Sequence, residues 1–560
     1  MVGKKGKLSF EEISRLLRSQ TIMLSLWGCE DKKSWGYQWY LALKKIFGEV
    51  ILFDPRAKRI EHGPELMKEN LLNTISEKKP DYFLFLIESS SLNIETIEEI
   101  NKLSPKTKTI VNFGDDDINF EERSRYYALF VDYCLLGQPN YKKSYIKDGL
   151  NKVFPFNGVN TEDFRPLKLE KKYDVSFIGQ PLESRIKLLS FLIKNKVKVN
   201  IWGRGWDKYP EFKEFYHGPL SPEDFVRTIN QSKINLSFTR NQYGAPHFTG
   251  RLFEFAACRA FQLTDYFPEL NIHLKENKEI VMFKDERDLL NKTNYYLKNE
   301  KEREKIAKNS LSKSKKHDFV YLFRKIFGEL SKEKKFVRKA LPKINAKEGS
   351  ISESDLKDIS SLKEKIKYYD YIFFSGRKVI ESKYRKYLQI YSLEKTKKDI
   401  SCCSYFIYSK YLGNYMKLNL FRGFERLGEE RFNGLLNLNQ FAVRKDYLLS
   451  NIDKFRKAAE TGVIDFISKS NTSLIKIPLV QIVKPTNFNE QNIKKLDKTS
   501  LNNAFQMEFT FKLHSLLYQK KIFFDSYIYK LIISSLIKRR KFILNIIYEL
   551  GKENLRNHGS

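Results

Sequence analysis

The feature that most constrains the fold is a regular alternation of short apolar runs and longer amphipathic segments. Between residues 21 and 156, apolar runs such as TIMLSL, VILFD, DYFLFLI and TIVNF alternate with stretches such as WGYQWYLALKKIF and IETIEEINKL. Strands and helices that alternate in this way form parallel βαβ units, with helices on both faces of a buried sheet. Residues 1–165 are therefore predicted to form a Rossmann-like domain.

The same alternation repeats between residues 171 and 298, from KKYDVSFIG through VKVNIWG, INLSF, FQLTD and EIVMF. Between the two series, the segment FPFNGVNTEDFRPLKLE supplies the Pro, Gly, Asn and Asp residues that a domain boundary requires. We predict a second Rossmann-like domain over residues 166–330, which faces the first across a cleft and ends in the aromatic helix FVYLFRKIF.

The rest of the chain is less regular. Residues 331–363 are polar and poor in aromatic residues, which is typical of a linker. Residues 364–486 contain strand-like runs and are interpreted as an accessory domain, and residues 487–560 are predicted to be helical and basic. Within them, residues 526–550 combine aliphatic faces with a basic cluster, which fits either packing on the accessory domain or peripheral contact with an anionic membrane. The cluster consists of Lys538, Arg539, Arg540 and Lys541.

Composition narrows the classes of function only a little. The net charge of +33 suits a polyanion, an anionic membrane or a phosphate-bearing substrate, and equally a coding bias spread over solvated faces. A nucleic-acid-binding protein is disfavoured, because no basic stripe interleaved with aromatics and no helix-turn-helix or RNP-like motif occurs. The 5 cysteines show no CxxC spacing, and no signal peptide or apolar run long enough to span a bilayer is found. We therefore expect a cytoplasmic protein, with peripheral contact at the inner face of the membrane as the further option.

The most informative segment is INLSFTRNQYGAPHFTGRLFEFAACRAFQLTDYFPEL, which covers residues 234–270. It is predicted to run strand, loop, helix, strand and loop, and a strand that feeds a helix N-terminus can bind an anion such as a diphosphate. Arg251 and Glu254 would share one face near the start of that helix. Arginine can pair with a phosphate, and a carboxylate can accept the hydroxyls of a ribose. The alternative is an ordinary surface ion pair.

Candidate residues for acid and base chemistry come from two loops. The acidic stretch NFGDDD follows a predicted strand in the first domain, so a carboxylate there could deprotonate an acceptor hydroxyl. The alternative is that these residues cap the helix that follows. A loop histidine before the Arg251 helix could touch the diphosphate or act as acid or base, although a plain loop residue is the alternative. The catalytic candidates are Asp115, Asp116 and His247, and the loop WGCEDKKSWGY adds the acceptor-side candidates Gly28, Trp35 and Tyr37.

The segment GRLFEFAACRAFQLTDYFPEL, with its continuation to FVYLFRKIF, resembles the C-terminal signature of the CgeB-like, spore-maturation-protein-type glycosyltransferases. Upstream, YDVSFIGQPLESRIKLL and VNIWGRGW are similar to further elements of that family, in the same order. The resemblance covers mainly residues 172–327. The sequence departs from the pattern at Arg259, where the family has Gly, and at Gln262, where many GT-B enzymes place the second acid of an E-x7-E pair. His317 and Arg324 match a late His and Arg element loosely.

The resemblance implies a GT-B fold and a glycosyltransferase of hexosyltransferase type that acts on cell-surface polysaccharide. A nucleotide-diphosphate sugar would be the donor, and a glycan, lipid-linked or protein molecule the acceptor. It implies no cofactor and no metal, because GT-B enzymes stabilise the leaving diphosphate with helix dipoles and basic side chains. The implied nucleotide-sugar-binding residues are Gly179, Gln180, Arg185, Gly203, Arg204, Gly205, Arg240, Arg251, Glu254, Thr264 and Asp265.

Two other interpretations stay open. The departures at Arg259 and Gln262 leave room for a catalytically inactive module that binds glycan or scaffolds assembly. The accessory region faintly resembles the latter half of a GT-A glycosyltransferase through YDYIFFSGRKVIESKYRKYLQIY and NQFAVRKDYL. There, Phe374, Ser375 and Gly376 stand where a D-x-D metal motif is expected, so we interpret the region as degenerate or accessory.

Overall fold

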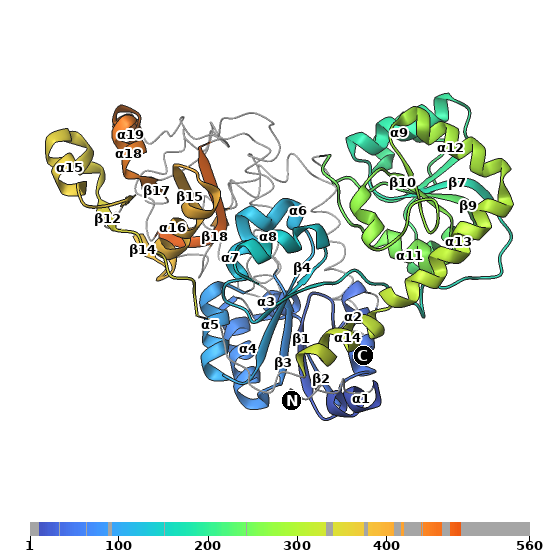
Figure 1. Cartoon of the computed structure of the whole chain (residues 1–560), viewed down its shortest axis with the longest axis horizontal. Helices are drawn as coiled ribbons and strands as arrows, with labels where there is room; N and C mark the ends of the chain where they lie inside the picture. The colour runs from blue at the N-terminus through green and yellow to red at the C-terminus, as the bar shows by residue number, and fades with distance from the viewer. Residues whose placement is uncertain are drawn as a thin grey trace, which may run out of the picture.

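The computed structural model contains three sheets, which form a first domain, a donor-side domain and a third domain (Figure 1). The predicted helical region over residues 487–560, with its basic cluster, lies outside the described residues. No helix in the described part of the chain is long and apolar enough to cross a bilayer. The structure describes residues 10–32, 34–62, 64–87, 92–150, 152–241, 244–331, 340–374, 379–407, 416–418, 438, 441–461 and 471–482.

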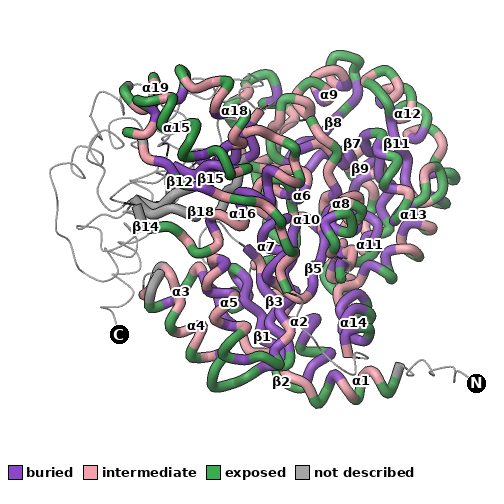
Figure 2. Tube along the Cα trace, turned by 60° about the vertical axis from the view of Figure 1, so that its left-hand side comes forward, coloured by how far each residue is buried: buried purple, intermediate pink, exposed green. Residues whose placement is uncertain are grey.

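The first domain is built on a six-stranded sheet in the order β2-β1-β3-β4-β5-β6, in which every pair of neighbours is parallel. Its inner strands are apolar on both faces because helices cover both sides, and Figure 2 shows β1, β3 and β5 as buried. The strands are β1 (Thr21–Ser25), β2 (Glu49–Phe53), β3 (Tyr82–Leu86), β4 (Lys108–Phe113), β5 (Tyr133–Leu136) and β6 (Val153–Pro155). The helices include α1 (Phe10–Arg18), α2 (Trp35–Lys44), α3 (Pro55–His62), α4 (Pro64–Lys78), α5 (Ile94–Leu103) and α8 (Lys142–Lys147).

One predicted helix of this domain is interrupted. The segment FEERSRYYALF was expected to continue from the acidic stretch as a single helix. It forms α6 (Asp116–Asn119), a π-helical turn η1 (Phe120–Ser124) and α7 (Arg125–Tyr127). A π-turn of this kind is often found at functional sites, and here it follows the acidic loop at the end of β4.

The donor-side domain has a five-stranded parallel sheet in the order β11-β10-β9-β7-β8. If the strands of each domain are numbered from its own first strand, both sheets begin in the order 2-1-3-4-5. The first domain has one more strand, β6, at its edge. The strands are β7 (Tyr173–Ile178), β8 (Val199–Trp202), β9 (Ser232–Ser237), β10 (Gln262–Asp265) and β11 (Val281–Phe283). The helices are α9 (Glu183–Lys194), α10 (Pro222–Gln231), α11 (Arg251–Ala257), α12 (Glu286–Lys298) and α13 (Glu300–Ser314).

The chain crosses between these two domains twice, at adjacent points. Val159 pairs with Asp318 in a parallel bridge, and Thr161 Oγ1 donates to Asp318 Oδ2 at 2.6 Å. The other oxygen of Asp318 accepts from Val320 N and so caps α14 (Phe319–Leu330). This helix returns to the first domain, where Phe323 and its neighbours join the core around α2 (Figure 1). The two predicted Rossmann-like domains and the aromatic crossover helix are thus confirmed.

The third domain is mixed α/β and begins earlier than predicted. Its first strand, β12, and the start of helix α15 lie inside residues 331–363, which the sequence assigned to a linker. The described strands are β12 (Glu348–Ile351), β13 (Tyr371–Phe374), β14 (Val379–Glu381), β15 (Ile400–Ile407), β16 (Met416–Leu418), β17 (Phe441–Arg444) and β18 (Thr472–Ile482). The helices are α15 (Ile359–Ile366), α16 (Arg385–Thr396), α18 (Lys445–Ser450) and α19 (Ile452–Thr461). Parallel and antiparallel pairs both occur in this sheet.

This domain is fused to the first one. A single hydrophobic core runs through both, and at its centre Tyr126 Oη lies 2.6 Å from Ser392 Oγ, which donates to Ser473 Oγ at 2.9 Å. At the end of β13, the fully buried Arg385 donates to the carbonyl of Phe374 at 3.2 Å. Ser375 and Gly376, which follow Phe374 at the position expected for a D-x-D motif, lie outside the described residues.

Candidate active site

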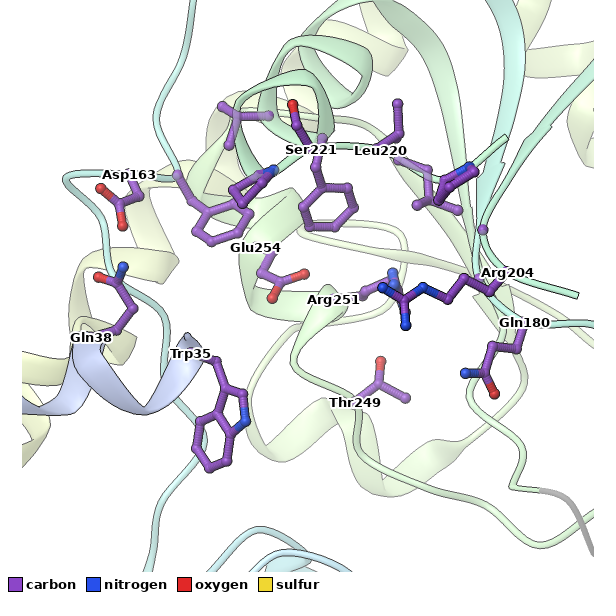
Figure 3. Close-up of a pocket in the computed structure, with 18 of the residues that line it drawn as sticks. Trp35, Gln38, Asp163, Gln180, Arg204, Leu220, Ser221, Thr249, Arg251 and Glu254 are labelled. Carbon is purple, nitrogen blue, oxygen red and sulfur yellow. The ribbon is translucent and has the colours of Figure 1, made fainter. Parts of the chain in front are cut away.

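A cavity of about 1320 Å³ lies between the first and donor-side domains, at the carboxyl ends of both parallel sheets (Figure 3). Open α/β sheets bind ligands at this edge, next to the point where the strand order reverses. Here that point lies beside β7 and β9 on the donor side and beside β1 and β3 on the other. The predicted residues that line the cavity are Trp35, Asp115, Gly179, Gln180, Arg185, Gly203, Arg204, Arg240, His247, Arg251 and Glu254.

The floor of the donor side is formed by two tightly packed turns after β7 and β8. Gly203 has φ of 130°, and a Cβ atom on it would lie 2.2 Å from the carbonyl oxygen of Gly179. Only glycine fits this position, because other side chains would clash and would also strain the backbone. Gly179 O also accepts from Trp206 Nε1 at 2.7 Å, so the buried indole fixes the turn. The close approach of the two turns leaves backbone facing the cavity.

Positively charged and hydroxyl donors converge above this floor. Arg185 and Arg251 both line the cavity, and burial together with the charge of Arg251 lowers the pKa of Arg185 to about 10. Among the described residues, no acceptor pairs with Arg185 Nε, Arg251 Nε or Thr249 Oγ1, although all three atoms are buried. Two like charges held together without a carboxylate partner are unfavourable on their own, so the site is suited to an anion.

Glu254 lies one helical turn after Arg251 on α11, and both side chains face the cavity (Figure 3). Burial raises the pKa of Glu254, and the charge of Arg251 opposes that shift. The carboxylate is available to accept hydroxyl donors from a ligand. This is the arrangement expected from the sequence, since residues three apart share a helical face.

An apolar recess adjoins these polar groups. The rings of Phe164 and Phe225 meet edge to face with centroids 5.7 Å apart, and the guanidinium of Arg251 lies 5.5 Å from the centroid of the Phe225 ring. Such a recess can receive a flat aromatic ligand group. The sequence analysis did not identify it, because apolar residues in loops carry no motif. Its other members are Leu167, Ile178, Leu182, Leu220 and Val226.

Several predicted residues do not line the cavity. Asp116 is buried under the acidic loop, where Tyr145 Oη donates to both carboxylate oxygens at 3.1 Å and burial raises the Asp116 pKa to about 7. The Gly28 amide donates to Asp54 Oδ2 at 2.6 Å, and the Tyr37 ring packs on Tyr40. These contacts give the three residues roles in shaping loops rather than in contacting a ligand.

Thr264 and Asp265 also lie behind the cavity wall, although the resemblance placed them at its edge. Thr264 is fully buried and donates to the carbonyl of Ser237. Asp265 accepts from the amide of Thr239 at 2.7 Å, and its other oxygen lies 3.8 Å from Arg240 Nε. Asp265 thus supports the loop that carries Arg240 into the cavity.

The two departures from the family pattern are both remote from the cavity. Arg259 follows α11 with φ of 53°, a left-handed conformation that explains why glycine is usual there, and its side chain pairs with Glu304 at 3.1 Å. Gln262 is buried at the start of β10 and donates to the carbonyl of Leu252 at 3.0 Å. Neither residue is among those that line the cavity.

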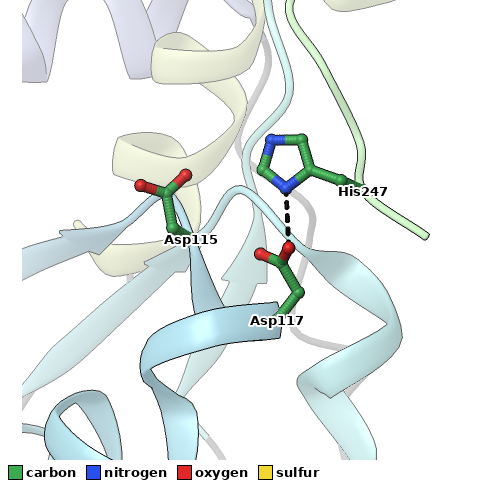
Figure 4. A group of neighbouring side chains, drawn as sticks. All are labelled: Asp115, Asp117 and His247. Atoms are coloured by element: carbon green, nitrogen blue, oxygen red, sulfur yellow. Dashed lines mark hydrogen bonds and ion pairs between the residues drawn. The ribbon is translucent and has the colours of Figure 1, made fainter. Parts of the chain in front are cut away.

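His247 reaches across to the first domain, where the sequence analysis missed its partner. Its Nδ1 lies 3.0 Å from Asp117 Oδ2, and Asn241 Nδ2 donates to the same oxygen at 2.6 Å (Figure 4). The side chain of Asp117 is only 3% exposed. The stretch NFGDDD contains this partner. Which of its three consecutive aspartates faces the cleft depends on where the following helix starts, and the sequence does not determine that position.

A second contact between the domains involves Gln138, which follows β5. Its amide nitrogen donates to the carbonyl of Phe248 at 3.1 Å, and its oxygen accepts from the Phe248 amide at 2.9 Å. The loop that carries His247 is therefore held against the first domain on both sides of the imidazole. No motif in the sequence marks this glutamine.

One group of residues near the cavity has side chains of the kind that bind a cation. Ligand atoms of Asp115, Asp117 and His247 lie within 4.8 Å of one another. His247 Nδ1 and Asp117 Oδ2 already satisfy each other, however, and that hydrogen bond would have to break for both atoms to bind a metal.

Comparison with known proteins places the similarity on the donor side. Residues 185–326 match the sequence model of the family described as Glycosyl transferase-like. Spore protein CgeB of Bacillus subtilis (strain 168) is 26% identical over 168 residues, which is 27% of this chain and 51% of that protein. The chain therefore spans about half the length of this curated relative. The predicted resemblance to CgeB-like glycosyltransferases is confirmed for this part of the chain.

Two solved structures each match a little over half of this chain. HepE of Anabaena, in complex with UDP and glucose, has a TM-score of 0.41 at 12% identity and covers 56% of this chain and 99% of its own. Sucrose-phosphate synthase of Thermosynechococcus elongatus has a TM-score of 0.42 at 10% identity, with 56% and 99% covered. Because these scores are low, the GT-B arrangement rests on the two facing parallel sheets and their shared strand order.

Proposed function

We propose that this protein is a metal-independent glycosyltransferase, of hexosyltransferase type, that takes a sugar from a nucleotide-diphosphate donor. One observation carries the proposal. Arg185, Arg251 and Thr249 line a single cavity, and each has a buried donor atom without an acceptor among the described residues. A diphosphate supplies the negative charge and the oxygen acceptors that these groups lack.

The rest of the donor fits the neighbouring surfaces. The ribose hydroxyls donate to Glu254, and the base enters the recess beside Phe225. The sugar then extends from the diphosphate toward the first domain. Arg204 and Arg240 line the same wall and add positive charge around the phosphates.

In the reaction, the acceptor hydroxyl attacks the anomeric carbon and the bond from that carbon to the diphosphate oxygen breaks. The leaving diphosphate takes the electron pair of that bond, and Arg185 and Arg251 stabilise its charge. The hydroxyl proton passes to His247, whose Nδ1 is held by Asp117 so that Nε2 is free to accept it. Asp115, which also lines the cavity, is the second candidate for the base.

The proposal is tested by calorimetry with UDP, GDP and dTDP, followed by an assay of sugar release from the matching nucleotide sugars. We expect one nucleotide to bind and its sugar to be released slowly in the absence of an acceptor. If none of the nucleotides binds the folded protein, a catalytically inactive binding or scaffolding module replaces the enzyme.

A further inference from the structure

Charge is divided unequally between the two walls of the cavity. The donor wall carries Arg185, Arg204, Arg227, Arg240 and Arg251. The wall facing it, here called the acceptor wall, carries Asp115, Glu162 and Asp163 against a single arginine among the described residues that line the cavity. This arginine is Arg165, whose Nη1 donates to the carbonyl of Glu162 at 2.8 Å. The wall consists of Ser34, Trp35, Gln38, Asp115, Ile118, Glu162, Asp163 and Arg165.

The acceptor wall presents an aromatic face to the cavity. Trp35 is the first residue of α2, and its indole is 45% exposed and points toward the cavity opposite Thr249 and Arg251 (Figure 3). The ring is held from behind by Trp39, with centroids 6.0 Å apart and planes at 84°. Trp39 in turn is buried against Phe156 and Phe323. An exposed indole on a rigid base is a preformed platform for a ligand.

Uncharged and acidic side chains that can accept hydrogen bonds lie beside this platform. Gln38 is one helical turn after Trp35, and its oxygen accepts from Asn160, whose amide nitrogen also donates to Asp163 Oδ2 at 3.0 Å. Figure 3 shows Gln38 and Asp163 next to each other above the indole. Glu162 is paired with Lys45 at 2.5 Å, which leaves the carboxylates of Asp115 and Asp163 to set the local charge. The wall therefore repels anions and offers oxygens that accept hydroxyl donors.

We infer that the acceptor is a neutral saccharide whose ring packs on Trp35 with its hydroxyls directed to Gln38 and Asp163. Sugar C–H groups carry a small positive charge and favour the negative face of an indole, while the hydroxyls need polar acceptors around them. A lipid phosphate or an acidic glycan would meet more carboxylates than cations on this wall. The inference rests on the proposed function, because it concerns the second substrate of the same site.

The test is binding to an array of neutral and acidic glycans with the tight-binding nucleotide present. Wild type should bind neutral glycans, and Trp35→Ala should reduce that binding by about tenfold, whereas Trp35→Phe should retain most of it. Trp27→Ala is the matched control, because Trp27 lies in the same loop, is 39% exposed and packs against Arg56 without lining the cavity. This variant should bind like wild type.

Nucleotide calorimetry on the same proteins separates the two proposals. If nucleotide binds but glycan binding is confined to acidic glycans, is absent, or is unchanged in Trp35→Ala, the saccharide inference is overturned while the donor site stands. Binding to vesicles that contain undecaprenyl phosphate, in place of neutral glycans, overturns it as well. If no nucleotide binds, the proposed function itself fails.

Discussion

The first and donor-side domains have the same strand order but treat the loops at their carboxyl edges differently. In the donor-side domain the helices that follow these loops carry Arg185 and Arg251, each with a buried Nε that has no acceptor among the described residues. In the first domain the loop after β1 is held by the polar groups after β2, because Asp54 accepts from the Gly28 amide and from the start of α3. The shared fold therefore does not determine the chemistry, which depends on which polar groups are left for a ligand.

The largest expected effect comes from removing His247, a donor-side residue whose hydrogen-bond partner lies in the first domain. His247→Ala should lower kcat by about 10²- to 10⁴-fold, because proton transfer from the acceptor loses its base. Nucleotide affinity should change little, since the imidazole is not needed for the diphosphate. Steady-state kinetics with calorimetry measures both quantities. Asp117→Asn should give a smaller loss in kcat with KM for the donor unchanged, and a loss confined to KM would contradict the role given to the pair.

The donor wall alone should control nucleotide affinity. Arg251→Ala and Glu254→Ala should each weaken binding by about 1.5–3 kcal/mol, as expected for one lost charge-assisted hydrogen bond. Calorimetry gives the change, and circular dichroism checks the fold. Arg259→Ala is the control, because its guanidinium pairs with Glu304 away from the cavity. Unchanged affinity in both cavity variants would remove this helix from the donor site.

In the first domain, the buried Asp116 should affect stability rather than catalysis. Its folded pKa of about 7 lies above the ordinary value for aspartate, so between about pH 4 and 7 the folded state holds a proton that the unfolded state releases. Stability therefore falls as pH rises through this window, on the order of 1 kcal/mol per pH unit from this group. Asp116→Asn, which stays neutral, should flatten the dependence and melt higher than wild type at pH 8. Thermal melts from pH 4 to 8 with parallel slopes for both proteins would disprove this.

A substitution in the core that the first and third domains share should have a smaller effect than the changes above. Tyr126→Phe removes the hydroxyl that bonds Ser392 across the shared core, while Ser392 keeps its bond to Ser473. We expect a loss of about 1 kcal/mol in the free energy of unfolding with no effect on nucleotide binding. Urea unfolding followed by tryptophan fluorescence measures the change. A separate early transition for the third domain would argue against a single shared core.

The smallest expected effect is that of chelation. Sugar release should persist in EDTA, because arginines neutralise the leaving diphosphate and the Asp117 and His247 atoms that could bind a cation already pair with each other. Activity assays with EDTA, with and without added Mg²⁺ or Mn²⁺, provide the measurement. Complete loss that either metal restores would make the Asp115, Asp117 and His247 group a metal site.

The alternation of strands and helices was sufficient to predict both parallel sheets, because short apolar runs between amphipathic segments are typical of strands that are buried on both faces of a sheet. The Arg251 and Glu254 pair was also accessible, since spacing along a helix fixes a common face. Asp117 and Gln138 were not, because their partners lie 130 and 110 residues away and only tertiary packing brings them together. The resemblance placed Thr264 and Asp265 at the cavity edge. In the structure, both residues lie on β10 behind the cavity wall and support it.

The two adjacent chain crossings at Val159 and Asp318 also bear on the fate of the activated sugar. A domain attached at one double crossing can rotate, and any opening separates Asp117 from His247 because they belong to opposite halves. When the cleft is open to water, the base has lost the carboxylate that orients it. Under the proposed function, this would suppress hydrolysis of the donor in the state where solvent has most access, and the pair would form again only as closure excludes water.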